Sequence, residues 1–513
     1  MTDWRAACAH FAQRHRTLPG TLRLLDAFGR PGDDPRAGAD FDALEAAARR
    51  DAPALPSAIV AALGSEVDCD QAALFARRAA AAWALLDGLA PDPTARVLRV
   101  GLACRLRDVL AASPPRALRV RAVVDFYTSQ AALVRHRHAG GPALDDRLAT
   151  LDWVDVAAGL RHARLSGPTD QGPVSANLLT VAPGCRLRTR DARGCGDVGA
   201  WVEAQGAAAA TSGGFFLYSE ADIEPPSARR DPVGLLVEGG AVTVPPLLRR
   251  TTLAQGRDGE ARICRLGPED AELVLDCGAR LRPVATNAPS ALAALIPRPD
   301  VIPVVAFNRA FGAISPPHAG RSVAVVGARI GSVGAGALPI PLHGAVLALP
   351  PGVTVAARRG RWHLRDPLTA AMAGGPRLLR DGRVDLDRAA DDLAGTAPPV
   401  TFSQDETYDQ NRLPRLGVGR RSDGTLVFAA IDGRDVERAP GFTLGGLARL
   451  LAAVGCTDAV NLDGGSSKRM VVAGRVVDRP STEVGGADGV SVRPVHTAVL
   501  IYARGVSPRG GGR

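Results

Sequence analysis

The chain has 513 residues, of which 46% are hydrophobic, 22% charged and 4% aromatic. This balance excludes disordered, collagen-like and disulfide-stapled miniprotein classes, and the length predicts two or three domains. The formal net charge is +9, but the excess is spread along the chain, with no basic run interleaved with aromatic residues. All but one of the 62 basic residues are arginines. This indicates a GC-rich coding bias, and we expect no nucleic-acid partner.

The cysteines and the uncharged stretches indicate where the protein resides. None of the eight cysteines forms a C-x-x-C pair, so a zinc ribbon or thioredoxin-type site is not expected. The start of the chain lacks the apolar core of a signal peptide, which predicts a cytoplasmic protein with reduced, mostly buried thiols. In an exported protein, Cys185 and Cys195 could instead bridge a hairpin. Residues 330–357 are uncharged but rich in Pro and Gly, which predicts strands and turns and no membrane span.

Residues 1–145 show the spacing of amphipathic helices. Apolar residues recur at helical intervals over 71–89, 94–112 and 117–136. We therefore predict a helical bundle domain over residues 1–145. It contains no catalytic set of residues, and it could recruit a protein partner.

After about residue 146 the pattern changes to short β-branched runs broken by Gly and Pro, which predict strands. One helix is clear, because Thr443 is a capping residue and Gly455 a stop signal on either side of an apolar face. The predicted fold is α+β. Residues 146–505 form one domain with a large mixed sheet, and residues 506–513 form a flexible tail.

Two aspartates each follow a predicted strand. Asp432 ends the run LVFAAI, Asp463 ends the run DAVNL, and the capped helix lies between them. This strand–helix–strand spacing is that of a βαβ unit, which places both carboxylates at one sheet edge. Paired carboxylates suit acid–base or nucleophilic work at a glycosidic bond, whereas simple Asp-Gly turn chemistry is the alternative. Gly464 and Gly465 could let an anion or sugar oxygen approach backbone N–H groups, but neither a P-loop nor a G-x-S-x-G elbow is present.

Six motifs occur in an order that resembles the phosphodiester glycosidase family, over about residues 150–503. They are SGGFF at 212–216, GGP at 374–376 with DG at 381–382, PRLGVG at 414–419, IDGR at 431–434, NLDGG at 461–465 and RPV at 493–495. The resemblance implies hydrolysis of a sugar-1-phosphodiester at the sugar–oxygen bond, which releases free sugar and a phosphomonoester. No cofactor or metal is implied.

The resemblance also implies roles for individual residues. Asp463 would be the nucleophile or water-activating base and Asp432 the orienting or acid–base partner, with the order of the two left open. His496 is either a proton carrier or a hydrogen-bonded structural residue. Arg415 is the first candidate for the phosphate because a guanidinium can hold an oxyanion with two donors. Arg434 and Arg493 are second candidates, or else ion-pair partners of the aspartates. The other predicted substrate-binding residues lie in turns: Ser212, Gly213, Gly214, Gly464, Gly465, Ser466, Ser467 and Lys468.

The chain departs from the family pattern at several of these positions. Family members usually carry Asn at the position of Ser212, Gly at Ser466 and often Asn at Thr497. These changes leave open the alternative that the protein is a binding module, which has kept the ligand-binding crevice at the sheet edge and has lost turnover. Lys468, the sole lysine, is either an exposed turn cation or an ammonium group that contacts a phosphate or an acidic sugar.

Overall fold

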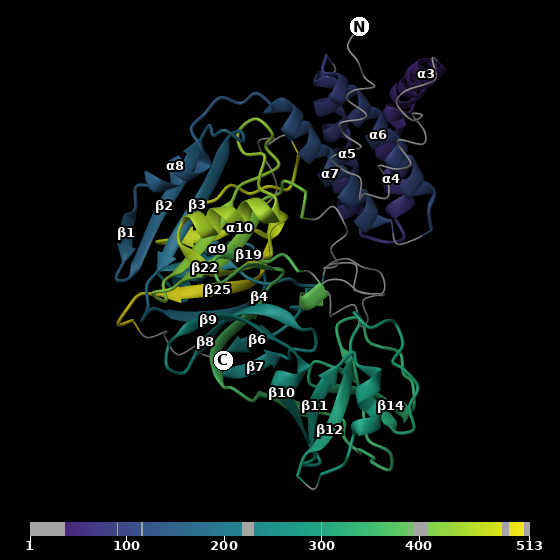
Figure 1. Ribbon diagram of the computed structural model, residues 1–513, viewed down its shortest axis with the longest axis vertical. Helices are drawn as coiled ribbons and strands as arrows, with labels where there is room; N and C mark the ends of the chain where they lie inside the picture. The colour runs from purple at the N-terminus through teal and green to yellow at the C-terminus, as the bar shows by residue number, and fades with distance from the viewer. Residues whose placement is uncertain are drawn as a thin grey trace.

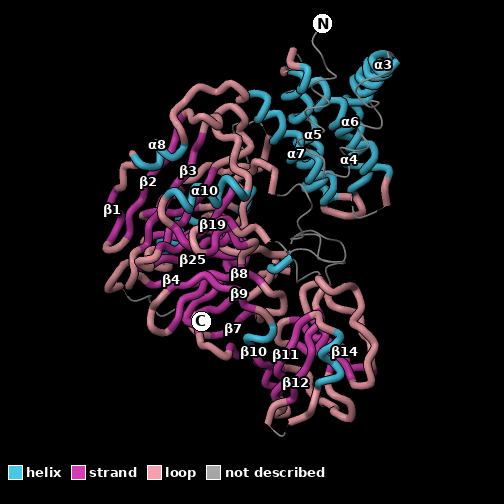
Figure 2. The backbone as a smooth tube through the Cα atoms, viewed as in Figure 1, coloured by secondary structure: helices cyan, strands magenta, loops and turns pink. Residues whose placement is uncertain are grey.

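The structure is a computed structural model, and it describes residues 36–89, 91–113, 116–217, 230–298, 300–387, 389–392, 409–484 and 492–506. A helical unit precedes a larger body built mainly of strands (Figures 1 and 2), which confirms the α+β class. Of the predicted tail, only Val506 lies within the described residues.

The helical unit confirms the predicted helices to within a few residues. Its core contains fully buried Leu86, Leu98 and Val124, and Asp68 and Asp92 cap the helices that follow them. A further helix packs instead into the core of the large sheet. The helices are α3 (Arg36–Asp51), α4 (Leu55–Leu63), α5 (Cys69–Gly88), α6 (Pro93–Ala111) and α7 (Ala117–Arg135) in the unit, and α8 (Leu144–Ala149) on the sheet.

The largest sheet has eight strands, and all its pairings are antiparallel. Helix α10 (Leu444–Ala453) packs on it with the predicted Thr443 cap, whose side chain accepts a hydrogen bond from the Gly446 N–H. In spatial order the strands are β1 (Val154–Ala157), β2 (Leu160–Gly167), β3 (Val174–Val181), β21 (Leu426–Ile431), β20 (Arg415–Arg421), β22 (Cys456–Leu462), β18 (Arg377–Arg380) and β19 (Arg383–Val384).

The predicted parallel relation of the two aspartate-bearing strands is confirmed, although they are not neighbours. Strands β21 and β22 each pair antiparallel with β20, which lies between them. They therefore run parallel to each other, and their carboxyl ends meet at one edge of the sheet. The amino end of β20 lies at the same edge, so three chain segments converge there.

Two five-stranded sheets pack near the large sheet and share its core, in which Phe428, Val460, Leu253 and Ile501 are buried. The first contains, in spatial order, β24 (Arg475–Val476), β23 (Met470–Val472), β5 (Ala209–Ser212), β25 (Val495–Tyr502) and β4 (Arg186–Cys195), with helix α9 (Val198–Ala204) beside it. The second contains β7 (Ala241–Val244), β6 (Leu236–Glu238), β17 (Leu368–Ala373), β8 (Arg250–Gly256) and β9 (Ala261–Leu266).

A seven-stranded sheet forms a separate lobe at the lower right of Figure 1, with its own core around Trp362. Its strands are β14 (Arg329–Ala335), β13 (Arg321–Val326), β15 (Ala345–Ala348), β12 (Ile302–Phe307), β11 (Arg280–Thr286), β10 (Ala271–Leu275) and β16 (Gly360–Leu364). The expectation of one large mixed sheet is wrong. The described strands form four sheets, and only this one has a parallel pair, β11 with β12.

The uncharged stretch 330–357 lies in the seven-stranded lobe as strands and turns, as predicted. No helix in the described part of the chain is long and apolar enough to cross a membrane. The expectation of mostly buried thiols is wrong, because only Cys185 and Cys456 of the seven described cysteines are buried. All seven are free thiols, so Cys185 and Cys195 are not bridged.

Candidate functional site

The predicted motifs meet at the sheet edge where β21 and β22 end. The Asp463 N–H donates to the Gly213 carbonyl at 3.0 Å, which joins the end of β22 to the end of β5. The Gly465 N–H donates to the Pro414 carbonyl at 2.8 Å, which joins the same turn to the start of β20. The N–H of Asp432 donates to Ser175 at the start of β3. Residues that are far apart in the sequence thus share one site.

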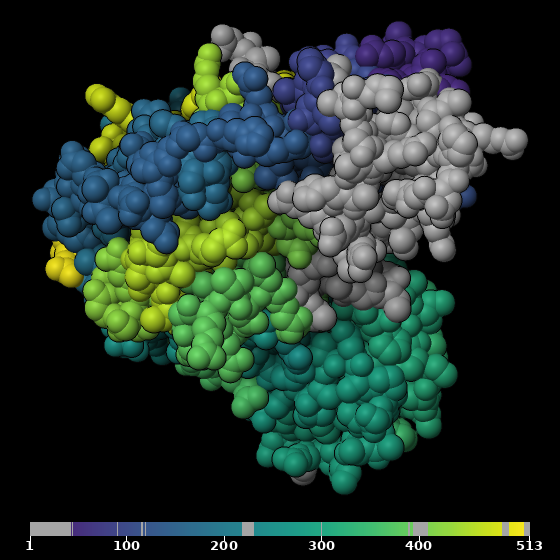
Figure 3. All heavy atoms as spheres, turned by 45° about the horizontal axis from the view of Figure 1, so that its top comes forward, coloured from purple at the N-terminus to yellow at the C-terminus, as the bar shows by residue number. Residues whose placement is uncertain are grey.

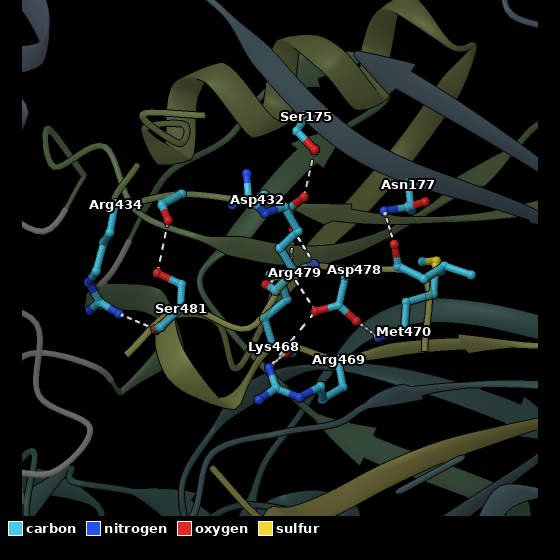
Figure 4. Close-up of polar contacts among 12 residues, drawn as sticks. Ser175, Asn177, Asp432, Arg434, Lys468, Arg469, Met470, Asp478, Arg479 and Ser481 are labelled. Carbon is cyan, nitrogen blue, oxygen red and sulfur yellow. Dashed lines mark hydrogen bonds and ion pairs between the residues drawn. The ribbon is translucent and has the colours of Figure 1, made fainter. Parts of the chain in front are cut away.

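Asp432 is locked in a buried polar network, which Figure 4 shows. Its carboxylate accepts hydrogen bonds from Lys468 Nζ at 2.7 Å, Ser175 Oγ at 2.6 Å and the Arg479 N–H at 3.0 Å. Only 3% of the residue is exposed. A carboxylate held by three donors is well fixed but poorly placed to exchange a proton or attack a substrate. This environment favours a positioning role for Asp432.

Lys468 is the centre of that network, and both earlier interpretations of it are wrong. Its side chain is 0% exposed, so it is neither an exposed turn cation nor open to a phosphate or sugar. Nζ donates to Asp432, to Asp478 Oδ2 at 2.6 Å and to the Arg479 carbonyl at 3.2 Å. These three acceptors use all three ammonium hydrogens. The sole lysine therefore joins the end of β21 to the hairpin of β23 and β24.

Asp463 differs from Asp432 because the residue is partly exposed and its carboxyl group has no cation in ion-pair contact within the described residues. Desolvation raises its pKa to about 6, and the charges of Arg493 and Arg121 and hydrogen bonds from Ser467 and the Gly464 backbone oppose that rise. A carboxyl group with a pKa near 6 changes protonation close to working pH, which is the property of a general acid or base.

Arg434 reaches across the turn after β22. Nη1 donates to the Ser481 carbonyl at 3.1 Å and to Ser466 Oγ at 3.3 Å, and Nε lies 3.6 Å from Asp125 Oδ1 of α7. Its backbone has φ of +66°, a left-handed conformation that is costly for a residue with a side chain. Arg434 is 5% exposed, and its ion pair is with Asp125, not with Asp432 or Asp463, the alternative partners considered from the sequence.

The environment of Arg415 does not favour phosphate binding. The residue is 1% exposed, and its guanidinium donates to the Phe442 carbonyl at 3.0 Å and the Asn411 carbonyl at 2.8 Å. These bonds join the start of β20 to the segments beside it. We therefore interpret Arg415 as a residue that holds the strand end in place.

The motif glycines allow the turns to pack against one another. A Cβ atom at Gly464 would lie 2.7 Å from the Pro414 carbonyl oxygen, and one at Gly213 would lie 2.6 Å from the terminal methyl of Met372. A Cβ at Gly214 would collide with the carbonyl of Ala373. Gly465 has φ of +58°, and its N–H is already bonded to Pro414. The Gly465 N–H is thus not available to an anion, contrary to expectation.

The hydroxyl residues of the motifs are also engaged. Ser212 Oγ accepts from the Arg469 N–H at 3.0 Å, and Thr497 Oγ1 donates to the Gly214 carbonyl at 2.7 Å. A side-chain hydrogen bond from Ser467 lowers the pKa of Asp463 and so opposes the effect of burial. Ser466 Oγ accepts from both Arg434 and Arg78 of α5. The positions that depart from the family pattern therefore have defined contacts here.

His496 is buried against Phe216, with ring centroids 4.1 Å apart, and Arg493 lies over the same ring at 5.5 Å. Burial, together with the charges of Arg493 and Arg230, lowers its pKa to about 4. The imidazole is therefore neutral at pH 7, and its Nδ1 has no hydrogen-bond partner among the described residues.

We expect the His496 ring to stay neutral in NMR titrations until the pH approaches 4. Because the folded pKa lies below the unfolded value of 6.5, this group contributes stability above pH 6.5 that is lost as pH falls to about 4. His496→Gln should remove this contribution from the pH dependence of the free energy of unfolding. An NMR pKa of 6.5 or higher would contradict the environment described.

Several site residues carry no signal in the sequence. Helices α5 and α7 contact the turns of the site through Arg78, which donates to the Thr482 carbonyl at 2.6 Å, and through Asp125. Ser129 of α7 accepts from the Arg412 N–H, and His136, which follows the helix, bonds to the Val436 carbonyl. Asp478 was also not predicted from the sequence. A buried lysine requires carboxylate partners, but the burial of Lys468 was not expected. The helical unit, predicted to contain no catalytic set of residues, lies against the site.

Comparison with known proteins confirms the resemblance over residues 343–502. Residues 343–502 match the family model described as phosphodiester glycosidase, a family of glycosidase-type hydrolases. A curated relative, the SPbeta prophage-derived uncharacterized protein YomE of Bacillus subtilis (strain 168), is 37% identical over 111 residues. This match covers 21% of the chain and 16% of that protein, so the chain spans much less than two thirds of its relative.

Three solved structures are similar to this one. A hypothetical protein from Synechocystis has a TM-score of 0.44 at 20% identity, covering 69% of this chain and 64% of that one. A putative exported protein from Burkholderia pseudomallei K96243 has a TM-score of 0.40 at 24% identity, and the match covers 66% of this chain and 75% of that one. The third is the catalytic domain of zebrafish N-acetylglucosamine-1-phosphodiester alpha-N-acetylglucosaminidase, described as auto-inhibited by its pro-peptide. It has a TM-score of 0.37 at 12% identity, and the match covers 72% of this chain and 88% of that one.

Proposed function

We propose that this protein hydrolyses a sugar-1-phosphodiester at the sugar–oxygen bond. The observation that carries the proposal is the carboxyl group of Asp463, a partly exposed residue, with its pKa raised to about 6 and with the charges of Arg493 and Arg121 acting on it. A base with this pKa is ionised at pH 7, and the arginines supply positive charge for a phosphate. The match of residues 343–502 to phosphodiester glycosidases supports the same reaction class.

In the proposed reaction, ionised Asp463 accepts a proton from water as the water oxygen bonds to the anomeric carbon. The bond between that carbon and the bridging oxygen breaks, and its electron pair leaves with the phosphomonoester. Direct attack by Asp463, followed by hydrolysis of the glycosyl ester, gives the same products. A phosphate ester is a good leaving group, so protonation by a general acid is less necessary than with an alcohol.

Asp432 has a positioning role in this scheme. With Lys468, Ser175 and the Arg479 N–H on its carboxylate, it fixes the end of β21 and hence the position of Arg434 two residues later. Lys468 in turn precedes β23, whose chain leads back through Ser467 and Ser466 to Asp463. The buried network therefore aligns the two turns that carry the proposed chemistry.

A second candidate is a module that binds a sugar phosphate without turnover. One observation favours it, because Ser466, which replaces the usual Gly of the family, has a hydroxyl group that holds both Arg78 and Arg434. In that case the contacts to Ser466 fix both guanidinium groups in the turn, and a bound sugar phosphate is held without being cleaved at Asp463.

The test is product analysis with a series of sugar-1-phosphodiesters. We expect equal amounts of free sugar and phosphomonoester from the parent chain, and no products from Asp463→Asn. Arg475→Gln, which changes an exposed residue of β24, is the matched control and should keep full activity. Sugar-1-phosphate binding without any release of sugar would favour the binding module instead.

A further inference from the structure

We propose that helices α5 and α7 complete an anion-binding subsite beside Asp463, in which Arg121 of α7 contacts the phosphate of the substrate and the buried guanidinium groups of Arg78 and Arg434 supply positive charge behind it. The proposal rests on the proposed function, which it extends by assigning part of substrate recognition to residues 36–135. Figures 1 and 3 show the helical unit beside the strand-rich body, with α7 among the helices nearest to it.

Arg78 comes from α5 but belongs to the site by its contacts. It is 3% exposed, its Nε donates to the Thr482 carbonyl at 2.6 Å, and its Nη2 donates to Ser466 Oγ at 3.1 Å. The same hydroxyl oxygen accepts from Arg434 Nη1 at 3.3 Å. Two guanidinium groups from different parts of the chain are thus brought together on one oxygen atom, three residues after Asp463.

Arg121 lies on the face of α7 that is turned toward the site. It precedes Asp125 by four residues, and residues at that spacing share one face of a helix. Asp125 lies 3.6 Å from Arg434 Nε, so this face borders the turn after β21. The charge of Arg121 acts on both Arg434 and Asp463, where it lowers both pKa values. Arg121 is partly exposed, so it can reach a ligand from α7.

Among the described residues, the charges that act on Arg78 and Arg434 are unbalanced toward the positive. Burial, and then the charge of Arg434, lower the pKa of Arg78 well below its usual value. Glu483, one of the carboxylates that act on Arg78, is in an ion pair with Arg77 at 2.9 Å. Asp125 is shared by Arg78 and Arg434, and Arg434 Nε has no hydrogen-bond partner among the described residues.

Gathering like charges in a buried place costs free energy unless an opposite charge joins them. A phosphate group would supply that charge and accept several N–H donors, because arginine holds phosphate oxygens with two donors at once. Its place between the arginines and Asp463 would bring the bond to be cleaved next to the carboxyl group. The neutral part of the sugar would gain nothing from these arginines, so the subsite selects for a phosphodiester over an ordinary glycoside.

Calorimetric titration of the full chain with inorganic phosphate tests the subsite without requiring turnover. We expect Arg121→Gln to weaken phosphate binding at least about tenfold, the loss of one charge-assisted contact. Arg78→Gln should do the same where it remains folded. Arg119→Gln, an exposed arginine on the same helix, is the matched control and should leave the affinity within about twofold.

The proposal is overturned if the parent chain binds no phosphate, or if Arg121→Gln and Arg119→Gln bind it equally well. Kinetics separate this failure from that of the proposed function. Raised KM for the phosphodiester in Arg121→Gln, with kcat little changed, supports the subsite, and KM equal to that of the parent contradicts it while leaving the hydrolase activity in place. Phosphate binding that depends on Arg121 in a chain that releases no sugar would support the subsite and contradict the hydrolase.

Discussion

Replacing Lys468 with methionine is expected to lower the free energy of unfolding by about 3–5 kcal/mol, the cost of leaving buried charges unpaired. The ammonium group, with a side chain that is 0% exposed, lies 2.7 Å from Asp432 and 2.6 Å from Asp478. Methionine fills much of the space of the lysine stem but neutralises neither carboxylate. Urea unfolding of the two proteins, compared at the same pH, measures the difference.

Two further variants make this test specific. Arg475→Met removes an exposed cation from the same hairpin and should change stability by about 0.5 kcal/mol or less. The triple variant Lys468→Met, Asp432→Asn, Asp478→Asn removes all three charges and should recover part of the loss, because the cost comes from unpaired carboxylates. If Lys468→Met is no less stable than Arg475→Met, the buried network does not hold the site together.

Replacing Asp463 with asparagine is expected to lower kcat/KM by about 10²–10⁴-fold, the usual contribution of a positioned acid or base. Asparagine preserves the size of the side chain but can neither accept the proton of water nor attack the anomeric carbon. In the parent, kcat/KM should rise with pH through an apparent pKa near 6 and level off above it, since the ionised carboxylate is the active form. His496 cannot cause this rise in kcat/KM near pH 6, because its pKa is about 4.

The same substitution should increase stability at neutral pH. The pKa of Asp463 is raised from 3.8 to about 6 in the folded protein, so ionising it costs more there than in the unfolded chain. The parent therefore loses stability as pH rises from about 4 to 6, and Asp463→Asn does not. The variant should have the higher Tm above pH 6 and an equal Tm near pH 3.5. A lower Tm for the variant at pH 7 would contradict the desolvated environment assigned to the carboxyl group.

The local pattern of the sequence predicted the elements that carry the site, but not all of their neighbours. The helical spacing, the Thr443 cap and the Asp-Gly pairs after β21 and β22 depend on residues close in the sequence, and these expectations were confirmed. The place of β20 between the two strands depends on long-range pairing, which periodicity does not encode.

The same limit explains the wrong expectations at single residues. Lys468 follows Asp463 closely in a turn, where an exposed cation is ordinary, but its partners Asp432 and Asp478 come from two other segments. Arg415 resembles an anion-binding residue until its backbone partners at Asn411 and Phe442 are known. Arg78 contacts a hydroxyl group 388 positions away, for which the sequence of α5 holds no sign.

The most direct test of the proposed reaction is hydrolysis of a sugar-1-phosphodiester in water enriched in ¹⁸O, with the ¹⁸O content of both products measured by mass spectrometry. Cleavage at the sugar–oxygen bond, with Asp463 activating water or forming a glycosyl ester, predicts one ¹⁸O atom in the sugar and none in the phosphomonoester. Label in the phosphomonoester would mean attack at phosphorus and would contradict the account.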